Sequence, residues 1–168
     1  MALSADKNEK TGSASLVGNH DADEKERQQF SIVRRAVEKT RLMVAGEMMV
    51  STADVSSKLT AAMTEFNKGE WQVALSLAQT AAGLYQEKLN RWERLVQQKE
   101  QAIKQRSLQK FRQVQCFHNP IRTNARQIVS TFRHLIDHLS ERINREAARR
   151  RYRKTESPID SNTSLLDE

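Results

Sequence analysis

The chain has 168 residues, of which 38% are hydrophobic, 29% charged and 5% aromatic, with five Gly and two Pro. This length suits one domain with tails, and so few Gly and Pro argue against strands joined by tight turns, which excludes most sandwiches, barrels and parallel-sheet enzymes. We expect an all-α protein, a four-helix antiparallel bundle with a long heptad-patterned third helix, flanked by disordered N- and C-terminal tails.

The single cysteine, Cys116, can form no intrachain disulfide and no thiolate zinc site, which favours a reducing compartment. Residues 1–20 lack the apolar core of a signal peptide, and no run approaches the roughly 18 apolar residues of a transmembrane helix. We therefore expect a cytoplasmic or nuclear protein that is not secreted and has no transmembrane segment.

The N-terminal part of the chain predicts a tail and one helix. Residues 1–20 are polar and predict a disordered tail, because their burial would not offset the entropy lost on ordering. Helix spacing then predicts a helix over 21–49, the start of a helical domain that extends to residue 154. Its apolar face would contain Phe30, Val33, Val37, Met43, Val44 and Met48.

A short second helix is predicted over residues 51–67. Ser51 begins the sequence STAD, which has the form of an N-cap followed by an acidic first turn. Gly69 fits the left-handed position that ends a helix and turns the chain. The apolar face would contain Val55, Leu59, Ala62 and Phe66.

The third helix, over residues 70–115, carries apolar side chains at alternating steps of 4 and 3, which is a heptad seam. We expect this seam to face a partner helix or a second copy of the chain, because its second half lacks flanking apolar residues. The seam contains Trp71, Leu75, Ala78, Ala82, Tyr85, Leu89, Trp92 and Val96.

The fourth helix is predicted over residues 120–152, because Asn119 and Pro120 have the form of a cap and first helical residue. The chain would then turn at residues 118–120 and fold back along the third helix. Residues 155–168 predict a disordered acidic tail. The apolar face of this helix would contain Ile121, Ala125, Ile128, Phe132, Leu135, Leu139, Ile143 and Ala147.

Residues 55–85 resemble a single helical hairpin of the tetratricopeptide-repeat family or of microtubule-interacting-and-trafficking domains. The resemblance rests on Gly69 at the turn, Trp71 at the aromatic position, and Ala62, Ala74 and Ala81 at small positions. Both families bind peptides or helices and catalyse nothing, so the resemblance implies close helix packing and a binding role.

The positive charge is concentrated in one segment. Residues 101–154 hold 14 basic and 3 acidic side chains, whereas residues 155–168 hold 4 acidic ones and the first hundred residues are neutral, which together gives the net charge of +7. We expect an acidic partner for residues 101–154. The residues expected to bind a polyanion are Lys99, Arg106, Lys110, Arg122, Arg126, Arg133, Arg142, Arg145, Arg149, Arg150, Arg151, Arg153 and Lys154.

Two residue pairs are candidate sites of chemistry. His134 and His138 could share a metal only with a third ligand from elsewhere, and Cys116 with His118 lacks any orienting group. No phosphate-binding loop or nucleophile elbow occurs. We expect no catalytic residue, no cofactor and no metal.

The sequence therefore favours a non-enzymatic helical interaction protein, a scaffold or adaptor subunit. It would self-associate, as a homo-oligomer, or bind a partner helix through the heptad seam, with its basic C-terminal half on an acidic partner. The alternative is a nucleic-acid-binding protein that contacts phosphates without reading bases. Attachment to a membrane is disfavoured because the apolar face of residues 120–152 is more simply used against the third helix.

Overall fold

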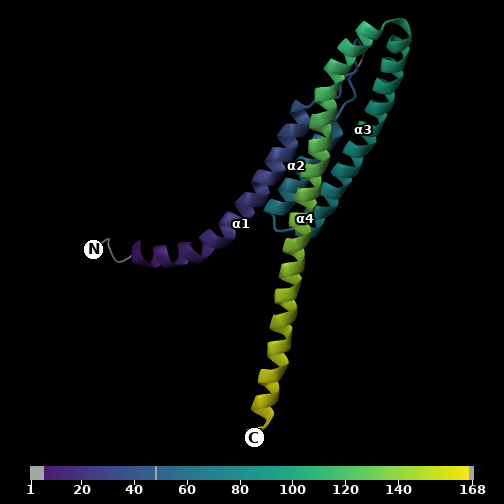
Figure 1. Cartoon of the computed structure of the whole chain (residues 1–168). Helices are drawn as coiled ribbons and strands as arrows, with labels where there is room; N and C mark the ends of the chain where they lie inside the picture. Colours follow the sequence, from purple (N-terminus) through teal and green to yellow (C-terminus); the bar gives the residue numbers. More distant parts are fainter. Residues whose placement is uncertain (1–5, 48, 167–168) are drawn as a thin grey trace.

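The computed structural model describes the backbone of residues 6–47 and 49–166, and the side chains of residues 23–47 and 49–154. Its helices are α1 (Asp6–Lys39), α2 (Ala53–Asn67), α3 (Trp71–Arg106) and α4 (Leu108–Leu166). Each helix runs antiparallel to the next (Figure 1), and both α1 and α3 pack against α2 and α4. The prediction of an all-α, four-helix antiparallel bundle with a long third helix is confirmed.

The core forms where the apolar faces of the four helices meet. Small residues of α3, including Ala74, Ala78 and Ala81, are fully buried, which allows neighbouring helices to approach closely. The predicted core positions of α2 are all buried, as are most of those on α4. The buried apolar residues of these two helices are Val55, Leu59, Ala62, Phe66, Ala125, Ile128, Phe132, Leu135 and Leu139.

The turn between α2 and α3 has the predicted conformation, but the start of α2 differs from the prediction. Gly69 adopts a φ of 83°, the left-handed conformation that a side chain would strain. The N-cap is Thr52 rather than Ser51, and it makes no side-chain capping bond. The carboxylate of Asp54 accepts a hydrogen bond from the backbone N–H of Val55 and pairs with Lys88 on α3.

The predicted extension of the first helix to residue 49 is wrong, because α1 ends at Lys39. Residues 40–47 and 49–52, here called the strap, are irregular and contain one antiparallel bridge between Leu42 and Val50, whereas Met48 lies outside the described residues. Leu42 and Val44, two residues apart, are both buried, an extended rather than a helical pattern. Gly46 has a φ of 74°, which is incompatible with a continuing right-handed helix.

The predicted turn at residues 118–120 is also wrong, because the chain turns at Ser107. Ser107 ends α3 by donating its backbone N–H to the carbonyl of Ile103, and its carbonyl accepts from the N–H of Phe111. Its hydroxyl accepts a hydrogen bond from the N–H of Lys110, in the first turn of α4. Asn119 and Pro120 therefore lie inside α4.

Residues 6–20 and 155–166, which belong to the predicted tails, run away from the bundle (Figure 1). The backbone of residues 6–20 continues α1 and that of 155–166 continues α4, so the described backbone there is helical rather than irregular. Residues 1–5 and 167–168, and the side chains of both predicted tails, lie outside the described residues. Disorder of those parts stays a prediction.

Candidate functional site: a basic helix end and two internal arginine clusters

The heptad seam of α3 lies inside the chain rather than on its surface. Ala78, Tyr85, Leu89, Trp92 and Val96 are buried. The other three seam residues, Trp71, Leu75 and Ala82, are partly buried against the same core. The assignment of this face to a partner or a second copy is therefore corrected, because α2, α4 and the strap already cover it.

Trp92 illustrates how the second half of the seam is covered. Its side chain is fully buried, and its indole N–H donates a 2.9 Å hydrogen bond to the carbonyl oxygen of Met43 in the strap. The strap thus covers the second half of the α3 seam, where the sequence has few apolar residues beside the seam. Trp92 belongs to the core of the single chain, which corrects the expectation that it lies at an interface.

Beyond Trp92, two polar residues occupy core positions of the α3–α4 hairpin. Glu100 follows Val96 by four residues on the buried face of α3, and His118 lies among the buried residues of α4. Nδ1 of His118 lies 3.1 Å from a carboxylate oxygen of Glu100, and Nη2 of Arg122 lies 3.0 Å from the same carboxylate. The hairpin is therefore joined by a buried carboxylate, a buried imidazole and a partly buried guanidinium group in place of an apolar layer.

The hydrogen bonds of His118 assign its tautomer. Nε2 accepts a 3.1 Å hydrogen bond from the backbone N–H of Ala45, so this nitrogen carries no proton. Nδ1 then carries the proton and donates it to Glu100. The sequence missed this network because a histidine and a glutamate interrupt the apolar stripes that reveal core positions.

At the other end of the bundle, Arg142 joins α4 to the three other helices. Its guanidinium pairs with Asp23 and with Glu26 on α1, the latter at 3.1 Å. The same group lies over the ring of Trp71, 4.5 Å from the centroid, and 5.4 Å from the ring centroid of Phe66. The guanidinium thus lies beside both rings.

Burial raises the pKa of Glu26 above its ordinary value, while the charge and hydrogen bonding of Arg142 oppose that shift. Desolvation is the larger of these effects. Arg142 favours the charged form of the Glu26 carboxylate, and burial disfavours it. Burial has the larger effect, so the pKa of Glu26 is raised.

Three of the predicted polyanion-binding residues pair with acidic side chains of other elements of the chain. Lys99 forms a 3.1 Å ion pair with Glu47 of the strap. Arg122 binds Glu100 and also donates to the side-chain oxygen of Asn119. Together with Arg142 they make contacts between elements, and their assignment to an external polyanion stays a prediction.

The remaining predicted basic residues are exposed, in two groups. Arg106, Lys110, Arg126 and Arg133 are exposed along the hairpin. The other group is the basic end, defined as residues 145–154, which contains six basic residues and Glu146 as its one acidic residue. It lies on the part of α4 that extends past the other helices (Figure 1).

The ion pairs recorded within the basic end are weak. Arg145 pairs with Glu141 at 3.4 Å and Arg150 with Glu146 at 3.8 Å, and the two arginine side chains remain 71% and 76% exposed. Exposed pairs of this kind contribute about 0–1 kcal/mol to stability. An acidic partner that binds these arginines more strongly can therefore replace Glu141 and Glu146. Tyr152, 68% exposed, lies within the same segment.

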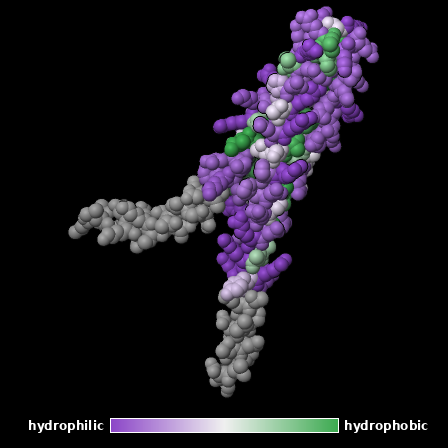
Figure 2. Space-filling model, in the orientation of Figure 1, coloured by the Kyte–Doolittle hydropathy of each residue, from purple (hydrophilic) through white to green (hydrophobic). Residues whose placement is uncertain are grey.

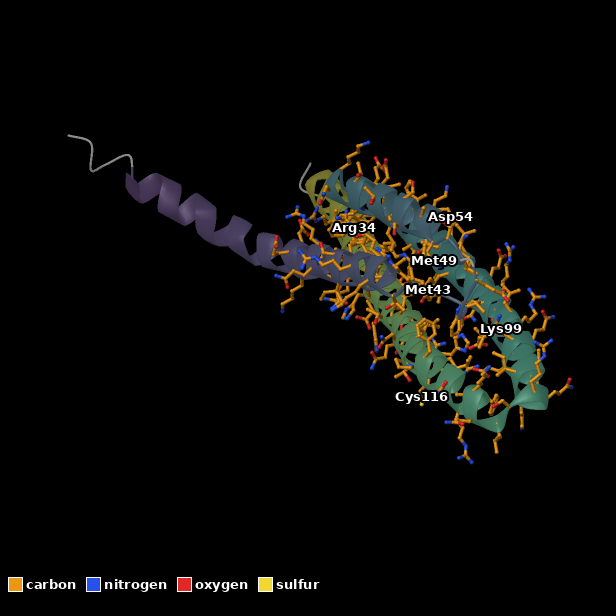
Figure 3. The ribbon with its side chains drawn as sticks, turned by 90° about the horizontal axis from the view of Figure 1, so that it is seen from above. Arg34, Met43, Met49, Asp54, Lys99 and Cys116 are labelled. Carbon is orange, nitrogen blue, oxygen red and sulfur yellow. The ribbon has the colours of Figure 1, made fainter. Side chains whose placement is uncertain are left out.

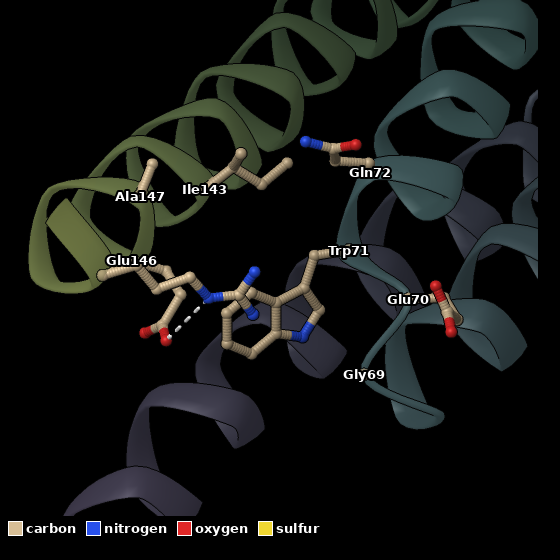
Figure 4. A pocket seen from close by; sticks show the side chains of 8 residues that line it. Gly69, Glu70, Trp71, Gln72, Ile143, Glu146 and Ala147 are labelled. Atoms are coloured by element: carbon tan, nitrogen blue, oxygen red, sulfur yellow. Dashed lines mark ion pairs between the residues drawn. The ribbon is translucent and has the colours of Figure 1, made fainter. Parts of the chain in front are cut away.

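A small groove lies where the basic end leaves the bundle. It has a volume of about 380 Å³ and lies between the start of α3, at Gly69 and Trp71, and the α4 residues Ile143 and Ala147. Figure 4 shows the indole of Trp71 projecting toward α4 beside the ion pair of Glu146 with Arg150. The groove is open and mixes both charges, so it lacks the converging polar groups of an enzyme pocket.

The residue pairs weighed for chemistry are separated or exposed. Cys116 is exposed near the tip of the hairpin (Figure 3), whereas His118 is buried and bonded to other partners. His134 and His138 are both exposed on α4. Among the described residues, no three His, Cys, Asp or Glu side chains come together in a group that could hold a metal ion.

Comparison of the chain with models of known families, with curated proteins and with solved structures finds no match. The resemblance of residues 55–85 to a tetratricopeptide-like or microtubule-interacting-and-trafficking hairpin therefore stays a prediction. Within the described part of the chain, none of the helices has the length and apolar character needed to cross a membrane.

Proposed function

We propose that this chain is a non-enzymatic helical interaction protein, a scaffold or adaptor subunit, that docks on an acidic partner protein through the basic end. The observation that carries this proposal is the position of that segment: six basic residues lie on a helix that extends past its own bundle. Residues 148–154 are exposed on all sides of this helix, so a partner can reach its whole circumference there. Its positive charge attracts an acidic surface over roughly a Debye length, about 8 Å at physiological salt.

The surface of the bundle supports docking by charge rather than by an apolar face. Figure 2 shows a largely hydrophilic surface on the face in view, with apolar side chains in small separate patches. The large apolar residues of the predicted seam are used inside the chain. Charge complementarity therefore supplies the main attraction, and the affinity should fall as salt is added.

A second candidate is binding to nucleic acid through the same segment. Five of the six basic residues are arginines, which suit phosphate groups, and the exposed Tyr152 offers a ring on which a base could stack. Such binding would contact phosphates without reading a base sequence.

The test compares two variants with equal loss of charge. In the first, Arg149, Arg150, Arg153 and Lys154 become Gln, and in the second, Lys104, Arg106, Lys110 and Arg112 become Gln. Each variant loses four positive charges from exposed helix positions and keeps helix-compatible side chains. Affinity purification of each chain, with and without nuclease treatment, is followed by mass spectrometry.

The proposal predicts that the first variant loses a protein partner that the wild-type chain and the second variant retain, with or without nuclease. Equal capture by the wild-type chain and both variants would contradict it. If capture depends on nuclease-sensitive material, duplex DNA binding should show a log–log salt slope that flattens by about 3–4 units in the first variant.

A further inference from the structure

The strap is attached to the α3–α4 hairpin by three polar contacts. The carbonyl of Met43 accepts from the indole of Trp92, the N–H of Ala45 donates to His118, and Glu47 pairs with Lys99. Between these contacts the strap buries the side chains of Leu42 and Val44 completely or nearly so. Residues of the strap therefore form part of the core without belonging to a helix.

The contact between Ala45 and His118 needs a neutral imidazole. A backbone N–H is only a donor, so Nε2 must be unprotonated to accept from it. If His118 gains a proton at Nε2, two donors face each other at this distance and the hydrogen bond is lost. The contact with Glu100 persists, because Nδ1 carries a proton in both states.

We propose that His118 is a pH-sensitive latch, whose protonation releases the strap from the hairpin while the α3–α4 contact persists. The closed strap binds one proton fewer than the released strap. Linkage then requires that closure be favoured at higher pH and weakened as pH falls.

The charged groups around His118 make this release selective. On α3, Glu100 attracts a protonated imidazole. On α4, Arg122 offsets part of that attraction, because its Nη2 lies 3.0 Å from the Glu100 carboxylate. On the strap, the charged side chain fixed to the hairpin is Glu47, which is paired with Lys99 of α3. Protonation of His118 therefore strengthens the hairpin contact with Glu100 and removes only the strap contact.

Release of the strap would change the surface of the bundle. Leu42 and Val44 would move out of the core, and the indole N–H of Trp92 would lose its acceptor on Met43. The uncovered second half of the α3 seam would then be an apolar surface of the kind that amphipathic helices bind. Acidification would thus convert a covered face into an exposed one.

The experiment measures amide hydrogen exchange of the full chain at about pH 8 and about pH 5, corrected for the intrinsic pH dependence of exchange. We expect protection at Ala45 and its strap neighbours to fall about tenfold at the lower pH, the factor that loss of one such hydrogen bond gives. Protection within α3 and α4 should persist. Simultaneous loss of protection in the strap and in all helices would mean global acid unfolding and would overturn the proposal.

Two variants separate His118 from the other histidines. His118→Gln cannot titrate, so its strap should exchange equally at both pH values after correction. His134→Gln, a matched change at an exposed position of the same helix, should keep the wild-type response. A response that persists in His118→Gln would show that another group is responsible.

Nitrogen NMR of the wild-type chain gives a test that does not depend on the folding of any variant. Nε2 of His118 should be unprotonated at the higher pH and should gain its proton over the same range in which strap protection is lost. A strap that stays protected while His118 is protonated would overturn the latch.

Discussion

Arg142 holds α1 against α4 with a single guanidinium group. It lies near two carboxylates of α1 and over the face of Trp71 at the start of α3. An arginine suits this position because its planar group combines ion pairing with stacking on an aromatic ring. Replacement of Arg142 therefore removes both kinds of contact and leaves Glu26 partly buried without its cation.

We expect Arg142→Gln to destabilise the bundle by about 1–3 kcal/mol, because a stacked charge and its hydrogen bonds are lost together.

Glu26→Gln should behave differently. The raised pKa of Glu26 means that the folded state binds its proton more tightly than the unfolded state, so stability falls as pH rises above the ordinary value of 4.5 through the folded-state pKa. Gln lacks this titration.

Stability of Glu26→Gln should therefore equal that of the wild-type chain in acid and match or exceed it at neutral pH. Urea denaturation of both variants at several pH values measures these differences. A large loss of stability in Glu26→Gln at neutral pH would show that the pair with Arg142 outweighs the burial of Glu26.

At the scale of elements, α4 carries a proline in its interior. Pro120 lies twelve residues after the start of α4 at Leu108, where a helix residue would donate its N–H to the carbonyl of Cys116. The helix tolerates the missing bond because the network of Glu100, His118 and Arg122 fixes the same turn to α3. Tertiary contacts thus override a strong local signal for a helix start.

Pro120→Ala should stabilise the chain by up to about 3 kcal/mol, because it restores a helix hydrogen bond and removes a steric clash. Asn124→Ala, at an exposed position on the following turn, measures the gain from helix propensity alone, which is below about 1 kcal/mol. Thermal unfolding followed by circular dichroism compares the two variants. Equal gains in stability from the two variants would indicate that α4 accommodates Pro120 in its interior as well as a helix accommodates proline at its first position.

At the scale of the whole molecule, one chain closes its own apolar core. The predicted seam is covered by α2, α4 and the strap, and the charge is left at one end of a long helix. The bundle covers its own apolar core, and the basic end lies outside that core. Folding and partner binding therefore depend on different parts of the molecule. Changes at the basic end should therefore affect binding with little effect on stability.

Because core formation needs no second copy, the thermal midpoint should be independent of protein concentration over about a hundredfold range. Differential scanning calorimetry checks this directly, and sedimentation equilibrium measures any association through other surfaces. A midpoint that rises with concentration would show that assembly contributes to the folded state.

The helical class, the number of helices and most of the buried faces could be predicted from the residues alone. These features depend on local periodicity, which the apolar residues of α2 and the second half of α4 preserve without interruption. The left-handed turn at Gly69 was equally local. Gly46 was the available signal that the first helix ends before residue 49, although the extended path of Leu42 and Val44 depends on what they pack against.

The position of the turn between the long helices, and the choice of which charged residues stay exposed, depend on contacts between helices. Glu100 and His118 fill core positions as polar residues, so they interrupted the apolar pattern, and Asn119 with Pro120 then gave a stronger local signal than the true turn at Ser107. Arg122 and Arg142 resemble surface arginines in sequence, because helical spacing cannot show which carboxylates another helix will bring to them. Pairing across elements is a property of the packed bundle, and it separates the internal arginines from those of the basic end.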